Sequence, residues 1–136
     1  MSSPEGLDLG RPAFVYKILM ADDWRADTPV VPTTPLDVKD GFIHLAIGPQ
    51  IAGVLERYFG HDRDLVCLRF SCQTLSQQGD GCLLRWEMSQ NGEVFPHFYG
   101  NLLASWSDLQ YLIPKDRASR NTLLRHLQKR ELDEHI

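Results

Sequence analysis

Two histidines of the chain stand in the middle of short, aromatic-rich segments that have the pattern of strands. His44 lies in the segment 40–45, DGFIHL, and His97 lies in the segment 95–100, FPHFYG. Imidazole exchanges protons near neutral pH and is the side chain used most often for general acid–base catalysis. Strand alternation places aromatic rings on the same face as each histidine. If both faces point to one side of a sheet, the two imidazoles line an aromatic pocket.

A carboxylate could orient one of these histidines or act in the chemistry itself. Glu87 lies on a segment that faces the His97 segment across a hairpin, although the register is open at this point. The alternative for Glu87 is a surface carboxylate, and the alternative for each histidine is a core residue bonded to a carbonyl or a carboxylate. The predicted catalytic residues are therefore His44, His97 and Glu87.

Further residues could contact a substrate, because they are polar or aromatic and lie on the same or neighbouring segments. They are Tyr16, Lys17, Trp24, Asp40, Gln50, Trp86 and Tyr99. Tyr16 and Lys17 are alternatives, since neighbouring residues of a strand point to opposite faces. Asp40 could instead cap the turn at Gly41, and Gln50 could be an exposed residue at the start of a helix.

Other kinds of chemistry find little support in the motifs. The H-E-x-x-H and two-Cys, two-His spacings are absent, so we predict no metal and no obligatory cofactor. The P-loop, the G-x-S-x-G elbow and the G-x-G-x-x-G turn are absent as well. The three cysteines, Cys67, Cys72 and Cys82, form no C-x-x-C pair, which favours a reducing compartment over a disulfide framework.

Length and composition indicate one globular domain. The chain has 136 residues, 43% of them hydrophobic and 24% charged, with a net charge of -4. This charge does not favour nucleic acid as a partner. A small-molecule substrate is expected from the histidine pocket. The sequence shows neither a signal-peptide pattern nor an apolar run long enough to span a membrane, and this predicts a cytoplasmic protein. The oligomeric state stays open.

The periodicity of the apolar residues predicts the elements that would position these side chains. Strands are expected at 14–20, 41–47, 64–71, 82–88, 93–99 and 108–113. A helical turn is expected at 21–26, helices at 49–59 and 116–130, and a proline-rich loop at 27–39. This order predicts an α+β fold with a mixed, mainly antiparallel sheet and a few helices. We expect a flexible N-terminus (1–12), a single catalytic or ligand-binding domain (13–113) and a C-terminal helical extension (114–136).

Over residues 14–113 the chain resembles the family catalogued as domain of unknown function 952. The motifs that carry the resemblance are 15–18, Trp24, 40–45, Gln50, 58–59, 64–66, 86–87 and 95–100. That family looks like a compact relative of the ADP-ribosyltransferase fold, and the segment 42–45 is similar to a histidine-bearing strand that RNA 2'-phosphotransferases use around NAD. The resemblance implies that fold and makes NAD a possible cofactor. Where such transferases carry a histidine or arginine on the first strand, this chain has Lys17, and Ala46 stands where a serine commonly follows.

The residues predict a small metal-free enzyme in which His44 and His97 act as an acid and base pair on a small organic substrate. Isomerase, lyase, cyclase or group-transfer chemistry would suit such a pair. The resemblance implies a second possibility, NAD-dependent ADP-ribosyl transfer or binding of an ADP-ribose-like ligand. A third possibility is a non-enzymatic binding module whose histidines are structural.

Overall fold

The computed structural model describes residues 12–25, 27–79 and 81–134. The N-terminus that the sequence predicts to be flexible, 1–12, lies outside these ranges except for Pro12. In the first sheet, β3 (Leu65–Ser71) pairs antiparallel with β1 (Phe14–Met20) on one side and with β6 (Ser107–Ile113) on the other. Because β3 is the central strand with both faces covered, only its last residue is incompletely buried.

The second sheet carries the histidine segments. Its central strand is β5 (Val94–Tyr99), which pairs antiparallel with β4 (Leu83–Met88) and with the two-residue strand β2 (Ile43–His44). The β4–β5 hairpin turns at Gly92, whose φ of 85° is one that glycine adopts without strain. The antiparallel pairing and the α+β class agree with the sequence prediction, but the strands form two sheets where one was expected.

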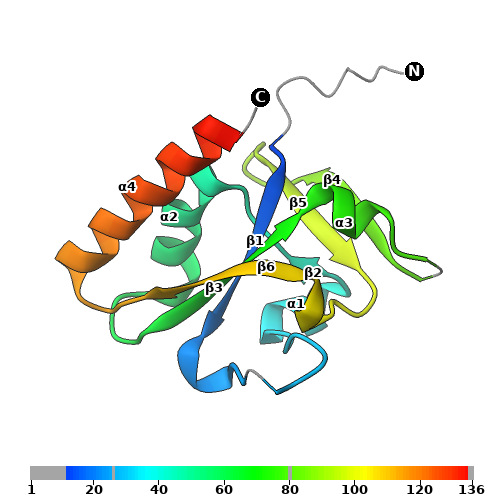
Figure 1. The fold of residues 1–136 in the computed structure, drawn as a ribbon, viewed down its shortest axis with the longest axis horizontal. Coiled ribbons are helices and arrows are strands. Elements are labelled where there is room, and N and C mark those ends of the chain that lie inside the picture. Colours follow the sequence, from blue (N-terminus) through cyan, green and yellow to red (C-terminus); the bar gives the residue numbers. More distant parts are fainter. Residues whose placement is uncertain (1–11, 26, 80, 135–136) are drawn as a thin grey trace.

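The two sheets meet at one pair of backbone hydrogen bonds. Tyr16 N donates to Ala46 O at 2.8 Å, and Ala46 N donates to Tyr16 O at 3.0 Å. β1 therefore connects the first sheet to the chain that follows β2 (Figure 1).

Apolar side chains fill the space between the sheets and the space between the first sheet and the helices. The inter-sheet core contains Val15, Leu19, Val31, Ile43, Leu45, Val66, Leu68, Phe70, Leu75, Phe98 and Leu102. The helix-side core contains Tyr16, Ile18, Ala46, Ile51, Leu55, Leu65, Cys67, Ile113, Leu124 and Leu127. Alternation along β1 and β3 supplies residues to both cores, so the first sheet is the middle layer of the molecule.

The helical elements lie at the ends of the strands and over the first sheet. They are η1 (Ala21–Asp23), α1 (Pro35–Asp40), η2 (Gly48–Gln50), α2 (Ile51–Val54), η3 (Leu55–Phe59), α3 (Cys72–Ser76), η4 (Ala104–Trp106) and α4 (Arg117–Glu134). Segments η2, α2 and η3 follow one another without a break and form the helix expected at 49–59. Helices α2 and α4 lie together on one side of the first sheet (Figure 1). None of the described helices is long and apolar enough to cross a membrane.

Two local predictions were wrong, and one helix was not foreseen. The loop expected at 27–39 ends in α1, because Thr34 caps a helix whose first residue is Pro35, a position where proline costs no hydrogen bond. The strand expected at 41–47 is limited to Ile43–His44. Helix α3 was not expected, and it begins where the Ser71 side chain accepts a hydrogen bond from Thr74 N.

Candidate functional site

The pairing of β2 with β5 places the two histidines directly opposite each other. His44 and His97 are register partners, and their ring centroids lie 5.4 Å apart in an edge-to-face arrangement. The Phe42 ring stacks on His97 at 4.0 Å and lies 4.7 Å from His44. The aromatic contact on the shared face therefore agrees with the strand alternation read from the sequence.

A buried carboxylate, that of Asp37, holds His44 in place. Asp37 Oδ1 accepts from His44 N at 2.9 Å and lies 2.7 Å from His44 Nδ1. Its second oxygen, Oδ2, accepts from Lys17 Nζ at 2.7 Å and from Thr34 N at 3.0 Å. Four donor groups thus surround a side chain that is only 1% exposed. Asp37 positions His44 and is not itself available to a ligand.

The surroundings of Asp37 determine which ring nitrogen of His44 carries a proton. Burial would raise the pKa of Asp37, but the hydrogen bond from His44 and the charge of Lys17 together hold it well below its usual range. Burial lowers the pKa of Lys17, and the Asp37 carboxylate opposes that shift. An ionised carboxylate only accepts hydrogen bonds, so Nδ1 of His44 must be protonated and donate. The remaining nitrogen, Nε2, is the one that can exchange protons.

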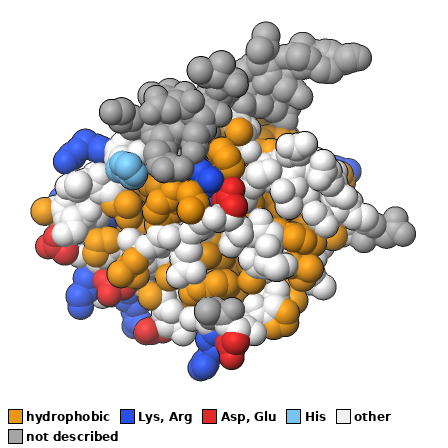
Figure 2. All heavy atoms as spheres, viewed as in Figure 1, with side chains coloured by type: hydrophobic (Ala, Val, Ile, Leu, Met, Phe, Trp, Pro, Cys, Tyr) orange, Lys and Arg blue, Asp and Glu red, His pale blue; other side chains and the backbone are white. Residues whose placement is uncertain are grey.

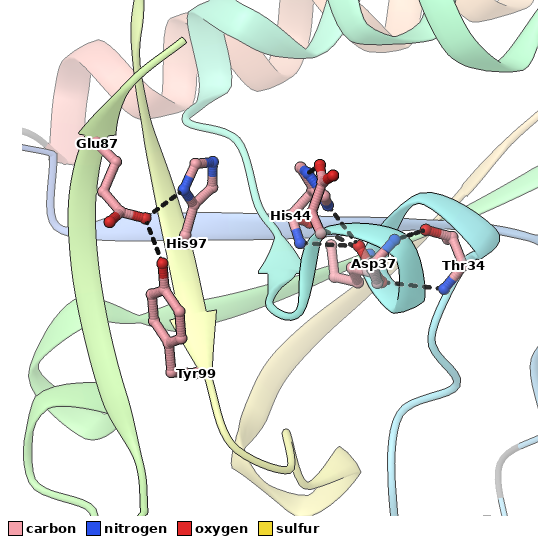
Figure 3. A network of polar contacts seen from close by, with 8 residues as sticks. Thr34, Asp37, His44, Glu87, His97 and Tyr99 are labelled. Carbon is pink, nitrogen blue, oxygen red and sulfur yellow. Dashed lines mark hydrogen bonds and ion pairs between the residues drawn. The ribbon is translucent and has the colours of Figure 1, made fainter.

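His97 is anchored in the same way by a carboxylate from the neighbouring strand. Glu87 Oε1 lies 2.7 Å from His97 Nδ1 and also accepts from Tyr99 Oη at 2.8 Å. The hydrogen bonds from His97 and then Tyr99 lower the pKa of Glu87, while the same carboxylate raises the pKa of Tyr99. Figure 3 shows Glu87 and Tyr99 on one side of the His97 ring, with Nε2 turned away from them.

Both histidines line a cavity with a volume of about 1000 Å³. This is at the upper end of the range of about 300 to 1,000 Å³ that small-molecule pockets occupy. Asp40 also lines the cavity, and its Oδ2 lies 2.9 Å from His44 Nε2. Within the described ranges, no hydrogen bond reaches Nε2 of His97.

The structure brings some of the predicted substrate-contacting residues to this site. Lys17 lies behind Asp37, Asp40 lies at His44, and the Tyr99 ring lies 5.4 Å from Phe42. Tyr16 contributes to the cavity wall, although it also belongs to the helix-side core.

The other predicted residues lie elsewhere. Trp24 packs on the inter-sheet core, and its Nε1 donates to Gln110 Oε1 at 3.3 Å. Trp86 packs on the same core, from the opposite face of β4 to Glu87. Gln50 is buried, and its amide accepts from Ile47 N and donates to Val94 O, so it joins the η2 turn to β5. None of these three side chains lines the cavity.

Sequence reasoning missed Asp37, which it placed in a loop. The sequence did contain a signal, because Thr34, Pro35 and Asp37 have the spacing of a capped helix start. In the structure the Thr34 side chain accepts a hydrogen bond from Asp37 N, and the Asp37 side chain accepts one from Thr34 N. Among the described residues, no group of three or more His, Cys, Asp or Glu side chains is arranged to hold a metal ion.

These features make the chain a small α+β protein in which a carboxylate-anchored histidine pair lies beside the junction of two antiparallel sheets. The chain belongs to the family described as "Protein of unknown function (DUF952)", which matches residues 18–106. A resemblance to this family was expected from the sequence, and the match confirms it.

Three solved structures of one bacterial relative share the fold. The crystal structure of protein CC0527 from Caulobacter crescentus is 32% identical in sequence, with a TM-score of 0.70 over 85% of this chain and 98% of that chain. A crystal structure of a double mutant of CC0527 gives a TM-score of 0.70 at 31% identity, over 85% and 98% of the two chains. The solution NMR structure of CC0527 gives a TM-score of 0.67 at 30% identity, over 84% and 96%. The comparison with curated proteins gives no match.

Proposed function

We propose that this protein is an enzyme that uses His44 and His97 as an acid–base pair on a small organic substrate, with no metal required. The observation that carries the proposal is the repeated anchoring of an imidazole. Asp37 holds Nδ1 of His44 and Glu87 holds Nδ1 of His97, each at 2.7 Å. In general, a carboxylate on one ring nitrogen fixes the tautomer and leaves the other nitrogen to exchange protons with a ligand.

The two histidines differ in what faces Nε2. Nε2 of His44 lies 2.9 Å from Asp40 Oδ2, a carboxylate oxygen that accepts hydrogen bonds. Within the described residues no hydrogen bond reaches Nε2 of His97, so its lone pair is open to a substrate proton. This geometry suits His97 as the base and His44 as the acid. Together they can remove a proton from one atom of a substrate and deliver a proton to another, as isomerisation, elimination, cyclisation or group transfer requires.

We propose further that the two-sheet arrangement is a compact version of the ADP-ribosyltransferase fold. The resemblance noted in the sequence implies that Lys17 stands where those enzymes carry a histidine or arginine that holds the nicotinamide ribose. Its side chain is 3% exposed, and it donates to Asp37 and to His44 O at 3.2 Å. A lysine with these partners does not fit a ribose-binding role, so we derive no step through NAD. A rise in melting temperature at millimolar NAD would favour that alternative.

The test of the proposal is a search for turnover followed by substitution of each histidine. Purified protein is incubated with a panel of small organic acids and their neutral amides and esters, and consumption is followed by proton NMR. We expect His44→Gln and His97→Gln each to lower turnover by about 10²- to 10⁴-fold, the usual contribution of one acid or base. His126→Gln, on the exposed side of α4, is the matched control and should retain full turnover.

Two results would contradict the proposal. One is a reaction that both histidine variants catalyse as fast as the wild type. The other is a panel that stays unconsumed while His97→Gln only lowers the melting temperature, because a structural histidine in a binding module predicts that pattern.

A further inference from the structure

The Asp40 carboxylate lies beside His44 Nε2 in the wall of the cavity, at a position that a ligand in the cavity would reach. Asp40 is the last residue of α1, and its side chain is 35% exposed where it meets His44 Nε2. The other carboxylate on this ring, Asp37, is buried and held by four donors, so it cannot leave. The Asp40 side chain has His44 as its only hydrogen-bond partner in the described part of the chain. A ligand can therefore displace Asp40, and an anionic ligand would restore the negative charge that Asp40 places beside His44.

Basic side chains stand around the same cavity. Lys39 and Arg57 both line it, from α1 and from η3, and both are exposed. Neither makes an ion pair within the described residues. Lys17 also lines the cavity, but Asp37 neutralises it at 2.7 Å. Lys39 and Arg57 are consequently the cations that remain available to an anion entering the cavity.

The other residues that line the cavity suit the apolar part of a ligand. The aromatic residues among the lining are Tyr16, Phe42, Tyr58, Phe59 and Phe95. Aromatic walls with a few convergent polar groups are typical of sites for small organic ligands. On the face of the molecule shown in Figure 2, basic and acidic side chains both occur along the outline.

We propose that the substrate is an organic carboxylate with a flat or apolar body, whose carboxylate displaces that of Asp40 beside His44 and is attracted into the cavity by Lys39 and Arg57. This inference rests on the proposed function, since it names the substrate class of the same site. Asp40 then acts as an internal competitor: it occupies the anion position until a substrate arrives.

The experiment uses benzoate as the probe and benzamide as its neutral counterpart, titrated into ¹⁵N-labelled protein. Benzoate should shift the backbone amide signals of Asp40, Phe42 and His44 and should bind at least about tenfold more tightly than benzamide, a difference of about 1.4 kcal/mol. Asp40→Asn should tighten benzoate binding by several fold, because the competitor loses its charge.

Removal of the cations should have the opposite effect. Lys39→Gln and Arg57→Gln should each weaken benzoate binding by about two- to fivefold, as expected for exposed charge pairs, and added salt should reduce the difference. Arg117→Gln is the matched control, because Arg117 is exposed and lies outside the cavity; its affinity for benzoate should equal that of the wild type.

Equal binding of benzoate and benzamide would overturn the inference, and so would an Asp40→Asn variant that binds benzoate no more tightly than the wild type. These outcomes are separate from failure of the proposed function. Turnover that survives in the histidine variants, together with the expected benzoate affinities, would refute the acid–base roles and leave the carboxylate site standing. Loss of turnover in the histidine variants without any preference for benzoate would refute the carboxylate site alone.

Discussion

Asp37 contacts both a buried residue, Lys17, and a partly exposed residue of the cavity, His44. Its carboxylate receives Lys17 and Thr34 on one oxygen and the backbone and ring of His44 on the other. Burial of such a charge is tolerated only when partners and hydrogen bonds compensate the loss of water. The orientation of His44 therefore depends on whether Asp37 is ionised.

Replacement of this carboxylate should lower stability in a pH-dependent way. Removal of one partner of a buried ion pair leaves the other uncompensated, so Asp37→Asn should cost about 3–5 kcal/mol near neutral pH. The folded-state pKa of Asp37 lies below its ordinary value of 3.8, so its contribution is fully present above that value and is lost as the pH falls through the folded-state pKa. The difference in unfolding free energy between wild type and Asp37→Asn should therefore shrink below about pH 4.

Urea unfolding at pH 6 and at pH 3 measures this difference. Asp22→Asn controls for the loss of one surface charge, because the Asp22 side chain is 88% exposed. If Asp37→Asn lowers the unfolding free energy by the same amount at both pH values, the partners of Asp37 do not lower its pKa, and the account of this carboxylate is wrong.

Helix α1 positions two of the groups that contact His44, although it is only six residues long. Thr34 caps its first turn, Asp37 lies at the third position, and Asp40 is its last residue. Gly41 follows with a φ of 83°, the left-handed conformation that ends helices and that glycine adopts without a Cβ clash. The chain then enters β2, so the start and the end of this helix together fix where His44 stands.

Loss of the cap should therefore affect both the helix and the site. Thr34→Ala removes the acceptor for Asp37 N, and we expect a loss of about 0.5–2 kcal/mol. The neighbouring Thr33→Ala is the matched control, because Thr33 is exposed and should change stability by less than about 0.5 kcal/mol. Thermal unfolding of the two variants gives the comparison. Equal stability of both would mean that the cap does not hold this helix.

The elements differ in how well the sequence predicts them. Strands β1 and β3 were predicted from apolar runs that are buried on both faces, and the two histidines were noticed because they stand among apolar and aromatic residues. Helix α1 was missed because three prolines indicated a loop, whereas Pro35 occupies a position where it favours a helix start. The hydrogen bond between Glu87 and His97 depends on hairpin register, which alternation alone does not fix.

At the scale of the whole molecule, the second sheet and the helices cover opposite faces of the first sheet, and several elements contribute to the cavity. Residues of β1, of the segment between α1 and β2, and of η3 all contribute to its walls. The sequence predicts a C-terminal helical extension, and α4 contributes Leu124 and Leu127 to the helix-side core. Long-range contacts of this kind are not encoded in local periodicity, which explains why the two-sheet arrangement was not predicted.

Arg120 ties the start of α4 to the loop before β3. Its side chain is 1% exposed and donates to the carbonyl oxygens of Pro114, Gly60 and Arg63. Buried acceptors that lose a donor cost about 1–3 kcal/mol each, so Arg120→Ala should lower the unfolding free energy by at least about 2 kcal/mol. Arg117→Ala, three residues earlier and exposed, should have little effect. Denaturant unfolding of the two variants tests this, and similar stabilities would contradict the role of Arg120.

The central claim, that each histidine is held through Nδ1 and offers Nε2 to a ligand, can be measured directly. Long-range ¹H–¹⁵N spectra of the imidazole side chains, recorded at a pH where the rings are neutral, report which nitrogen carries the proton. We expect Nδ1 of both His44 and His97 to carry a proton, and Asp37→Asn and Glu87→Gln each to alter only the ring that they contact. A bare Nδ1 on either ring in the wild type would contradict the account.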